Sequence, residues 1–305
     1  MYKVHRFLIL LMLLSMNCSF LMAQHDSVQS TPIYLQKINL QYDRSLHLSS
    51  GFTSFLYRDF ATSPLFYSGV GLRLAVGYEI KSDHDEHFFD LDYIIGVAFA
   101  VNPTPVTAGN STMAIMNTSN FYYHYLHELT RFNNDKYKIS LGGSFLNSLN
   151  VRVNQALNNN SAGIENISNF MFSLKLNRDI SRHQVIIEDL LLFKRKLMPS
   201  TRSLSFQCNI GLLNFNYRPG YAYNYLGEMD GSSTNILKYA IEDHLWSMNG
   251  IRLNTRLEFS YYKPYKNGSK WAYVWDFANV PGKFETYQSA FHRLEYVLII
   301  NRNKQ

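Results

Sequence analysis

The sequence predicts an all-β fold, an antiparallel transmembrane β-barrel of about ten strands, and three observations support this prediction. Apolar residues alternate with polar or small residues, with a period of two, along most of the chain. Most alternating segments reach roughly ten residues, the length that a tilted strand needs to cross a bilayer. The N-terminus has the layout of an export signal. Together these features favour a membrane barrel over a soluble β-sandwich, whose strands are usually shorter.

The composition excludes several classes of protein. Of 305 residues, 46% are hydrophobic, 15% aromatic and only 17% charged, which excludes a disordered chain. Sixteen glycines and eight prolines are too few for a collagen-like or proline-rich chain, and two cysteines are too few for a disulfide scaffold. The formal net charge of +6 is spread along the chain, so no nucleic-acid partner is expected.

The first residues predict a secretory signal peptide. A basic start at residues 3–6 precedes the unbroken apolar run 7–14, and Ala23 supplies a small residue at the expected cleavage position. The apolar run is shorter than the roughly 20 residues of a membrane-spanning helix. A lipoprotein signal ending before Cys18 is the weaker alternative, because the bulky Asn17 stands where such signals carry a small residue.

Ten segments carry the alternation, and each is expected to form one strand. They are residues 46–56, 66–80, 87–101, 121–129, 137–151, 170–176, 204–212, 251–261, 271–277 and 294–300. In the second of them Leu72 and Leu74 alternate with Gly71 and Arg73. Successive side chains of a strand point to opposite faces, so one face is apolar and the other is polar or small.

Proline and glycine agree with these strands. All eight prolines fall between them, where a missing N–H breaks no ladder. Eight glycines fall within strands, and all except Gly143 lie on the polar face. Small residues are expected there if that face lines the crowded interior of a narrow barrel.

The connections differ in length, as they do in membrane barrels. Residues 81–86, 133–135 and 264–269 are short and polar, whereas 102–118, 154–166 and 219–250 are longer and rich in Asn, Ser and Gly. An even number of strands brings both ends of the barrel to the side of the short connections.

The segment 184–198 fits this scheme less well. Its apolar residues Ile186, Leu190, Phe193 and Leu197 recur at helical spacing. It is expected to form a short amphipathic helix on the membrane surface or, alternatively, two further strands that would make a barrel of twelve. We favour ten strands.

These features resemble the single-chain outer-membrane β-barrel proteins of Gram-negative bacteria. The resemblance is one of architecture, not of a specific family motif. It implies a signal peptide at 1–23, a periplasmic segment at 24–45 and a barrel at 46–301, placed in the cell outer membrane after cleavage near Ala23. One departure is that many such barrels end on an aromatic residue, whereas the last strand here ends on Ile300.

Several charged residues on the polar face are expected to project into the lumen. They are Arg73, Glu79, Asp90, Asp92, Lys175, Arg252, Arg256 and Glu258. Two interpretations are open, an ion-selective pore and an interior salt-bridge core that closes the lumen. Barrels of about 8 strands are filled by side chains and those of about 16–18 leave a channel, so about ten strands favour the structural core.

The long connection 219–250 exceeds what a barrel needs and is the candidate site for an envelope protein partner. Its aromatic residues are Tyr221, Tyr223, Tyr225, Tyr239 and Trp246. The other expected partner is outer-membrane lipid.

No catalytic, metal or cofactor-binding residue is assigned. The run His84-Asp85-Glu86-His87 is explained better as a solvated charged turn than as a metal site, since zinc ligands usually come from spaced positions. A lipid hydrolase would need a Ser–His pair near the outer rim, where His124 is expected, but no serine lies in a recognisable signature beside a histidine.

The sequence therefore predicts a non-enzymatic integral outer-membrane barrel, an accessory or structural component of an envelope transport or assembly system. A narrow porin-like channel and an outer-membrane lipid hydrolase are the alternatives.

Overall fold

A computed structural model describes most of the chain from residue 43 onward. The described ranges are 43–59, 65–101, 113–134, 136–154, 162–181, 186–190, 193–197, 200–219, 244–247, 250–262, 267–281 and 286–301. The expected signal peptide and the periplasmic segment up to residue 42 lie outside them. The helix of these ranges, η1 (Thr130–Phe132), is a single 3-10 turn. Among the described residues, no helix has the length and apolar character needed to cross a bilayer.

Thirteen strands follow one another along the described ranges. They are β1 (Asp43–Asp59), β2 (Tyr67–Lys81), β3 (Asp85–Ala100), β4 (Met113–Glu128), β5 (Tyr137–Val153), β6 (Ala162–Asp179), β7 (Ile186–Leu190), β8 (Phe193–Leu197), β9 (Thr201–Pro219), β10 (His244–Ser247), β11 (Ile251–Tyr262), β12 (Gly268–Pro281) and β13 (Thr286–Asn301).

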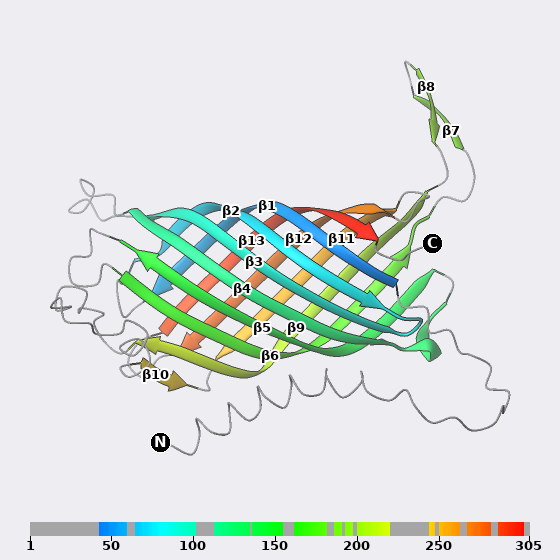
Figure 1. The fold of residues 1–305 in the computed structure, drawn as a ribbon. Coiled ribbons are helices and arrows are strands. Elements are labelled where there is room, and N and C mark those ends of the chain that lie inside the picture. Colours follow the sequence, from blue (N-terminus) through cyan, green and yellow to red (C-terminus); the bar gives the residue numbers. More distant parts are fainter. Residues whose placement is uncertain are drawn as a thin grey trace, which may run out of the picture. The chain divides into compact units, whose positions relative to one another are not determined.

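Ten of these strands close into a barrel. The order is β1-β2-β3-β4-β5-β6-β9-β11-β12-β13, and β13 pairs with β1 again. Every pairing is antiparallel, and the strands wind obliquely around a common axis (Figure 1). The short β10 pairs with the end of β9 and takes no part in closure. The predicted antiparallel barrel of ten strands is confirmed.

The barrel has two rims with different connections. At the first, which we call the terminal rim, β1 begins and β13 ends, and residues 82–84, 129–136, 180–200 and 263–267 connect strands. At the second, the loop rim, the connections are residues 60–66, 101–112, 154–161, 220–250 and 282–285. Both ends of the barrel therefore lie at one rim, as an even strand number requires.

The segment 184–198 differs from both expectations. Its described residues form β7 and β8, a two-stranded sheet separate from the barrel, so neither a helix nor a twelve-stranded barrel forms. The register places Glu188 opposite Arg195 and Asp189 opposite Lys194. The register joins the two strands as an antiparallel pair from Ile186 with Leu197 to Leu190 with Phe193.

Strands β4 and β6 begin earlier than expected. Residues 113–118 belong to β4 and residues 162–166 to β6, although both stretches were expected to be loops. Some outward positions in these stretches are polar, namely Asn117 and Asn166, so the apolar alternation that marks a strand is interrupted there.

A β-bulge in β9 changes the direction of its side chains. Phe170 pairs with Leu213 and Met171 with Gly211, which leaves Leu212 as the extra residue. Consequently Leu212 and Leu213 are both exposed, at 69% and 60%, and Asn214 is buried.

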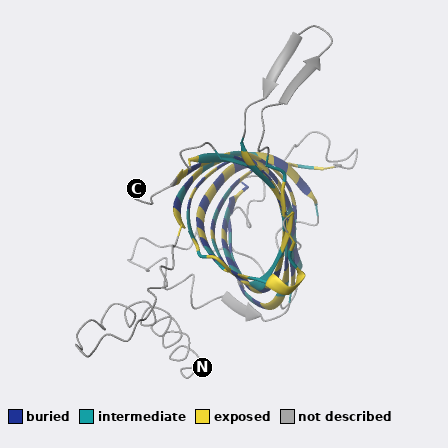
Figure 2. Ribbon diagram, turned by 90° about the vertical axis from the view of Figure 1, so that its right-hand side faces the viewer, coloured by how far each residue is buried: buried dark blue, intermediate teal, exposed yellow. Residues whose placement is uncertain are grey.

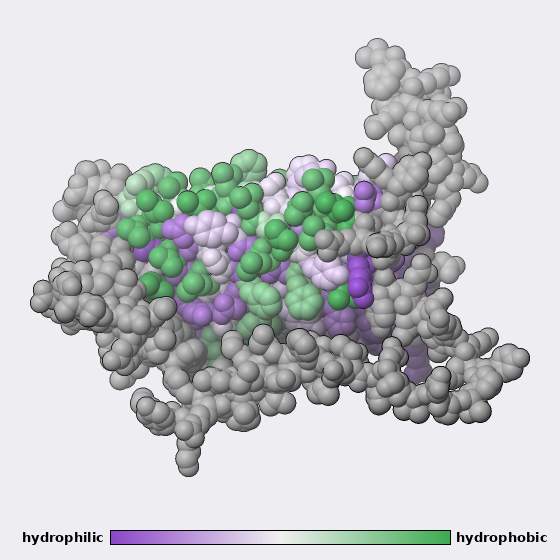
Figure 3. Space-filling view, viewed as in Figure 1, coloured by the Kyte–Doolittle hydropathy of each residue, from purple (hydrophilic) through white to green (hydrophobic). Residues whose placement is uncertain are grey.

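The two faces of the barrel wall differ in polarity. Along β2, Leu72, Leu74 and Val76 are exposed at 55%, 66% and 53%, whereas the intervening Arg73 is 2% exposed and points inward. The same alternation follows each barrel strand around the wall (Figure 2). Apolar side chains gather on the outer surface of the barrel (Figure 3). An outward apolar face is the property that a barrel needs in lipid.

Inward glycines make room for large side chains. The buried ring of Phe55 lies over two of them, because a Cβ on Gly69 would be 2.5 Å from Phe55 Cζ and one on Gly96 would be 2.7 Å from Phe55 Cε1. At Gly96 the carbonyl oxygen of Val70 is equally near, at 2.7 Å. These positions accept no side chain without movement of the backbone.

We therefore expect Gly96→Ala to destabilise the barrel by about 1–3 kcal/mol, the usual cost of overpacking. The measurement is the urea midpoint of unfolding in lipid vesicles. The control is Ser68→Ala, an outward exposed position on β2, whose midpoint should stay at the wild-type value. Equal midpoints for both variants would contradict the packing of Phe55 against Gly96.

Candidate functional site: the charged lumen

The centre of the lumen is a network of ion pairs around Glu295. This glutamate is fully buried, and three arginines approach its carboxylate: Arg256 at 3.2 Å, Arg73 at 3.4 Å and Arg293 at 3.6 Å. They come from β11, β2 and β13, which alternation directs inward at these positions. Three cations on one carboxylate need further anions nearby, since burying an unpaired charge is costly.

Two aspartates of β3 supply part of this charge. Arg73 Nη2 donates to Asp90 Oδ2 at 2.5 Å and Arg73 Nε to Asp92 Oδ2 at 3.1 Å. Arg293 reaches the same oxygen of Asp92 at 3.2 Å, and Asn120 donates to the other oxygen at 2.7 Å. Asp92 therefore links two arginines from strands far apart in the sequence.

Glu258 completes the central network. Its Oε1 accepts from Arg256 Nε at 2.5 Å and lies 3.0 Å from Lys270 Nζ. The central network then contains four cations and four carboxylates: Arg73, Arg256, Arg293 and Lys270 with Asp90, Asp92, Glu258 and Glu295. Equal numbers of opposite charge let the whole group be buried without a counterion from outside.

A second group of charges lies toward the terminal rim. Glu86 contacts His124 at 3.0 Å and Lys81 at 3.3 Å, and it also pairs with Lys175. Tyr122 is hydrogen-bonded to the other ring nitrogen of His124, at 3.1 Å. These contacts tie the start of β3 to β2, β4 and β6 across the lumen.

Ser45, His47 and Glu79 meet in the same region and resemble a catalytic triad in composition only. Ser45 Oγ lies 2.9 Å from His47 Nε2, and Glu79 Oε2 lies 3.2 Å from that same nitrogen. A relay needs the serine and the carboxylate on opposite ring nitrogens, and His47 Nδ1 has no hydrogen-bond partner among the described residues. The arrangement is a buried polar contact, not a nucleophilic site.

A separate bidentate pair lies closer to the loop rim. Arg252 donates from Nε to Asp276 Oδ1 at 3.0 Å and from Nη2 to Asp276 Oδ2 at 2.7 Å. It also donates to Ser148 Oγ at 2.8 Å, which joins β11 to β5 through the lumen.

The loop-rim end of the lumen is filled by an apolar cluster, which we call the plug. Its buried members are Phe55, Tyr57, Tyr67, Ala98, Ala114, Met116, Ile167, Ala278, Val280, Tyr287 and Phe291. Tyr57 and Tyr67 stack with ring centroids 5.0 Å apart. Arg152 lies over the Tyr57 ring at 5.1 Å and pairs with Asp59 at 2.6 Å and with Glu165.

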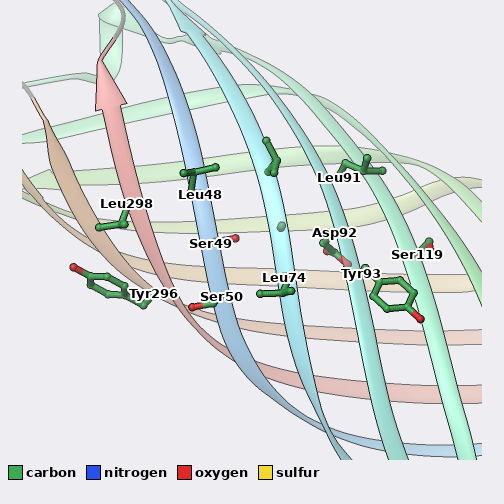
Figure 4. A pocket seen from close by; sticks show the side chains of 12 residues that line it. Leu48, Ser49, Ser50, Leu74, Leu91, Asp92, Tyr93, Ser119, Tyr296 and Leu298 are labelled. Atoms are coloured by element: carbon green, nitrogen blue, oxygen red, sulfur yellow. The ribbon is translucent and has the colours of Figure 1, made fainter.

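Little space remains between the plug and the central network. A cavity of about 10 Å³ lies there, lined by Thr118, Ser148, Arg252 and Arg293 among others. This is about the smallest space that can hold one water molecule. A larger groove, of about 510 Å³, lies on the outer wall across β13, β1, β2 and β3 and reaches Ser119 of β4 (Figure 4). Its apolar side chains, such as Leu48, Leu74 and Leu298, face the surroundings of the barrel and not the lumen.

The lumen residues expected from the sequence fall into separate groups. Five of them, Arg73, Asp90, Asp92, Arg256 and Glu258, lie in the central network. By contrast, Arg252 pairs with Asp276, Glu79 with His47 and Lys175 with Glu86.

The sequence analysis did not assign four further residues to the lumen, although each forms an ion pair there: Glu295, Arg293, Lys270 and Asp276. Their signal was present, since Arg293 and Glu295 alternate with the outward Leu294 and Tyr296.

The aromatic residues of the long connection are mostly not placed. Tyr221, Tyr223, Tyr225 and Tyr239 lie outside the described residues. Trp246 belongs to β10, and the register sets it opposite Tyr217 of β9.

The remaining candidates also have defined positions. At the start of β3, Asp85 accepts hydrogen bonds from Tyr125 at 2.8 Å and contacts His127 at 2.8 Å. Within the described ranges, no group of three or more His, Cys, Asp or Glu side chains is arranged to hold a metal ion. His124 does not lie at the loop rim. Strand β4 runs from the loop rim to the terminal rim, and His124 lies near its end, against Glu86.

Comparison with known proteins gives similarity of fold only. No family model and no curated protein matches the sequence. Among solved structures, the transport unit of the autotransporter AIDA-I from Escherichia coli has 7% identity and a TM-score of 0.38, over 88% of this chain and 93% of that one. The translocator domain of the autotransporter NalP from Neisseria meningitidis has 9% identity and a TM-score of 0.33, over 83% and 88%.

The COG4313 outer membrane channel from Pseudomonas putida F1 has 7% identity and a TM-score of 0.30, over 90% of this chain and 99% of that one. At these identities and TM-scores the likeness assigns neither a family nor an activity. The resemblance in architecture predicted from the sequence rests on the closed barrel itself.

The central network predicts a large effect for its shared carboxylate. Glu295→Gln leaves Arg73, Arg256 and Arg293 with one anion fewer in a buried place, and we expect it to lower the free energy of unfolding by about 3–5 kcal/mol. The measurement is urea unfolding in lipid vesicles.

The matched control for this variant is Lys138→Ala. Lys138 is 55% exposed and pairs with Glu128 at 3.2 Å, so its loss should cost no more than about 1 kcal/mol. If the two variants had similar midpoints, the central network would not be the element that stabilises the lumen.

Proposed function

We propose that this chain is an integral outer-membrane β-barrel protein that acts without catalysis, as a structural or accessory component of an envelope transport or assembly system. The observation that carries the proposal is a closed barrel with an apolar outer face and a lumen filled by its own side chains. Such a wall is soluble in lipid, because every barrel strand pairs on both sides and leaves no open edge.

The orientation follows from the two rims. The terminal rim has three short connections, and the loop rim has the longest one, residues 220–250. Bacterial outer-membrane barrels have short periplasmic turns and long outer loops, so the terminal rim belongs in the periplasm. Export through the signal peptide 1–23, with cleavage near Ala23 and a periplasmic segment at 24–45, is part of this proposal.

The two alternatives lack support from the lumen. A channel needs a continuous path, whereas the described lumen is occupied by the plug and by the central network. A lipid hydrolase needs a serine, a histidine and a carboxylate in relay order at the outer rim. The Ser45–His47–Glu79 contact has the wrong order and lies near the terminal rim.

The contribution to a partner complex is proposed for the long connection 220–250 and its aromatic residues, for which a barrel alone has no need. Tagging the folded protein in native membranes and identifying co-purifying chains tests this part of the proposal. A partner that is lost when residues 220–243 are shortened would support it.

Membrane fractionation tests the location. We expect the protein to remain in the outer-membrane fraction after a carbonate wash, and to migrate differently on SDS gels before and after heating, as closed barrels do. Recovery in the aqueous fraction without detergent would show that the apolar face is not a lipid-facing wall.

Conductance separates the closed lumen from a channel. In planar bilayers the wild-type protein should give no stable conductance steps. Arg73→Ala should lower the unfolding midpoint, because Asp90, Asp92 and Glu295 lose their shared cation. A variant that conducts at an unchanged midpoint would mean that the charges gate a pore and do not form a structural core.

A further inference from the structure

The outer wall of β4, β5 and β6 contains a group of polar side chains that we call the wall patch. Its members are Asn117, Ser119, Asn147, Asn166 and Ser168. They are neighbours across the sheet. The register sets Asn147 opposite Ser168, and Leu149 lies between Ser119 and Asn166.

The wall patch lies within the apolar band and not at its edge. On β4 the exposed Met113 and Ile115 lie on its loop-rim side, and the exposed Phe121 lies on its terminal-rim side. On β6 the exposed Phe170 and Phe172 follow it toward the terminal rim. Lipid tails would therefore surround these polar groups on a barrel that spans a membrane.

The hydrogen-bonding capacity of the wall patch is only partly used. Tyr93 donates to Asn117 Oδ1 at 2.7 Å. Asn147 Nδ2 donates to Asn166 Oδ1 at 2.5 Å and to Ser168 Oγ at 2.6 Å.

Several groups of the wall patch remain without a hydrogen bond to any described residue. They are the amide N–H groups of Asn117 and Asn166, the Ser119 hydroxyl and Asn147 Oδ1. Polar groups left unpaired in hydrocarbon are costly, so this surface is explained poorly by contact with lipid alone.

A second feature of the same wall is Gly143 of β5, on the terminal-rim side of Asn147. It is the strand glycine that faces outward, and a Cβ there would meet only Met171 O, at 3.7 Å. At each of the other described glycines, a Cβ would come within 3.2 Å of another atom. The barrel itself therefore does not require a glycine at position 143. The missing side chain leaves a notch on the same outer face, with Phe145 between it and Asn147 of the wall patch.

We propose that the wall patch and the notch at Gly143 form an intramembrane interface with a second copy of this chain. The interface rests on the membrane-spanning barrel proposed above. The wall patch has both free donors and a free acceptor, so the same surface of another copy can pair with it. A two-fold axis along the membrane normal brings equal depths together, which sets one wall patch against the other. A small residue lets two walls approach closely, as it does between membrane helices.

Disulfide cross-linking in native outer membranes tests the interface. The background variant is Cys208→Ala, which removes the free cysteine of the described residues. Ser119→Cys, Asn147→Cys and Ser168→Cys each place one thiol in the wall patch. The matched control is Ser54→Cys, an outward exposed position on β1, which lies five strands from β6 in the ring of ten. We expect oxidation to give a dimer of this chain with at least one wall-patch variant and none with the control.

The other outcomes overturn the proposal. A protein that fractionates with the outer membrane but gives no dimer from any wall-patch variant leaves the barrel proposal intact and removes the interface. Equal dimer yields from the control indicate random collision, and a cross-link to a different protein removes the second copy as the occupant. A protein absent from the membrane fraction fails the proposed function itself.

Filling the notch provides an independent check. In Gly143→Leu the Cβ would meet only Met171 O, at 3.7 Å, and the side chain would point outward, so the urea midpoint should hold while the dimer yield from the cross-linking variants falls severalfold. An unchanged yield would show that the walls do not meet at Gly143.

Discussion

Every charged side chain inside the closed wall needs a partner inside the same wall, because the outer face of the wall is apolar and the interior is packed with side chains. Glu295 shows this constraint most clearly, since three arginines converge on it from three strands. The central network meets the constraint with equal numbers of cations and carboxylates. At the plug, Arg152 pairs with Asp59 and Glu165 and also lies over the rings of Tyr57 and Tyr287. A closed barrel of this kind thus requires that its buried charges be paired within it.

The barrel could be predicted from the sequence because the two faces of its wall differ in polarity. Leu72 and Leu74 face one way and Arg73 the other, and this contrast gave the period of two, the ten strands and the inward direction of the charges. The partners of those charges could not be read. Arg73 on β2 meets Glu295 on β13 only because the ring closes, and no local pattern encodes which strands become neighbours across a lumen.

The errors of the sequence prediction have physical causes of their own. The starts of β4 and β6 were missed because Asn117 and Asn166 are polar on the outer face, where a membrane strand should be apolar. The separate sheet β7–β8 was not predicted: the segment was expected to form a helix or two further barrel strands, because apolar spacing alone does not reveal which residues pair with each other. Positions that depart from the alternation of apolar and polar residues, while the fold stays intact, are often functional, and the polar residues of the wall patch depart in this way.

The pairing of β1 with β13 determines when, during folding, the central network can be completed. These two strands come from opposite ends of the barrel sequence, so the ring cannot shut before its final strand has arrived. Strand β13 also supplies Arg293 and Glu295. Glu295 pairs with Arg73 of β2, and Arg293 pairs with Asp92 of β3. A chain without β13 would keep Arg73 paired with Asp90 and Asp92, but it would lack the contacts of Glu295 with Arg73 and Arg256 and that of Arg293 with Asp92. It would also leave β1 and β12 without their partner strand, so the closed wall and the full set of central ion pairs form together, when β13 is in place.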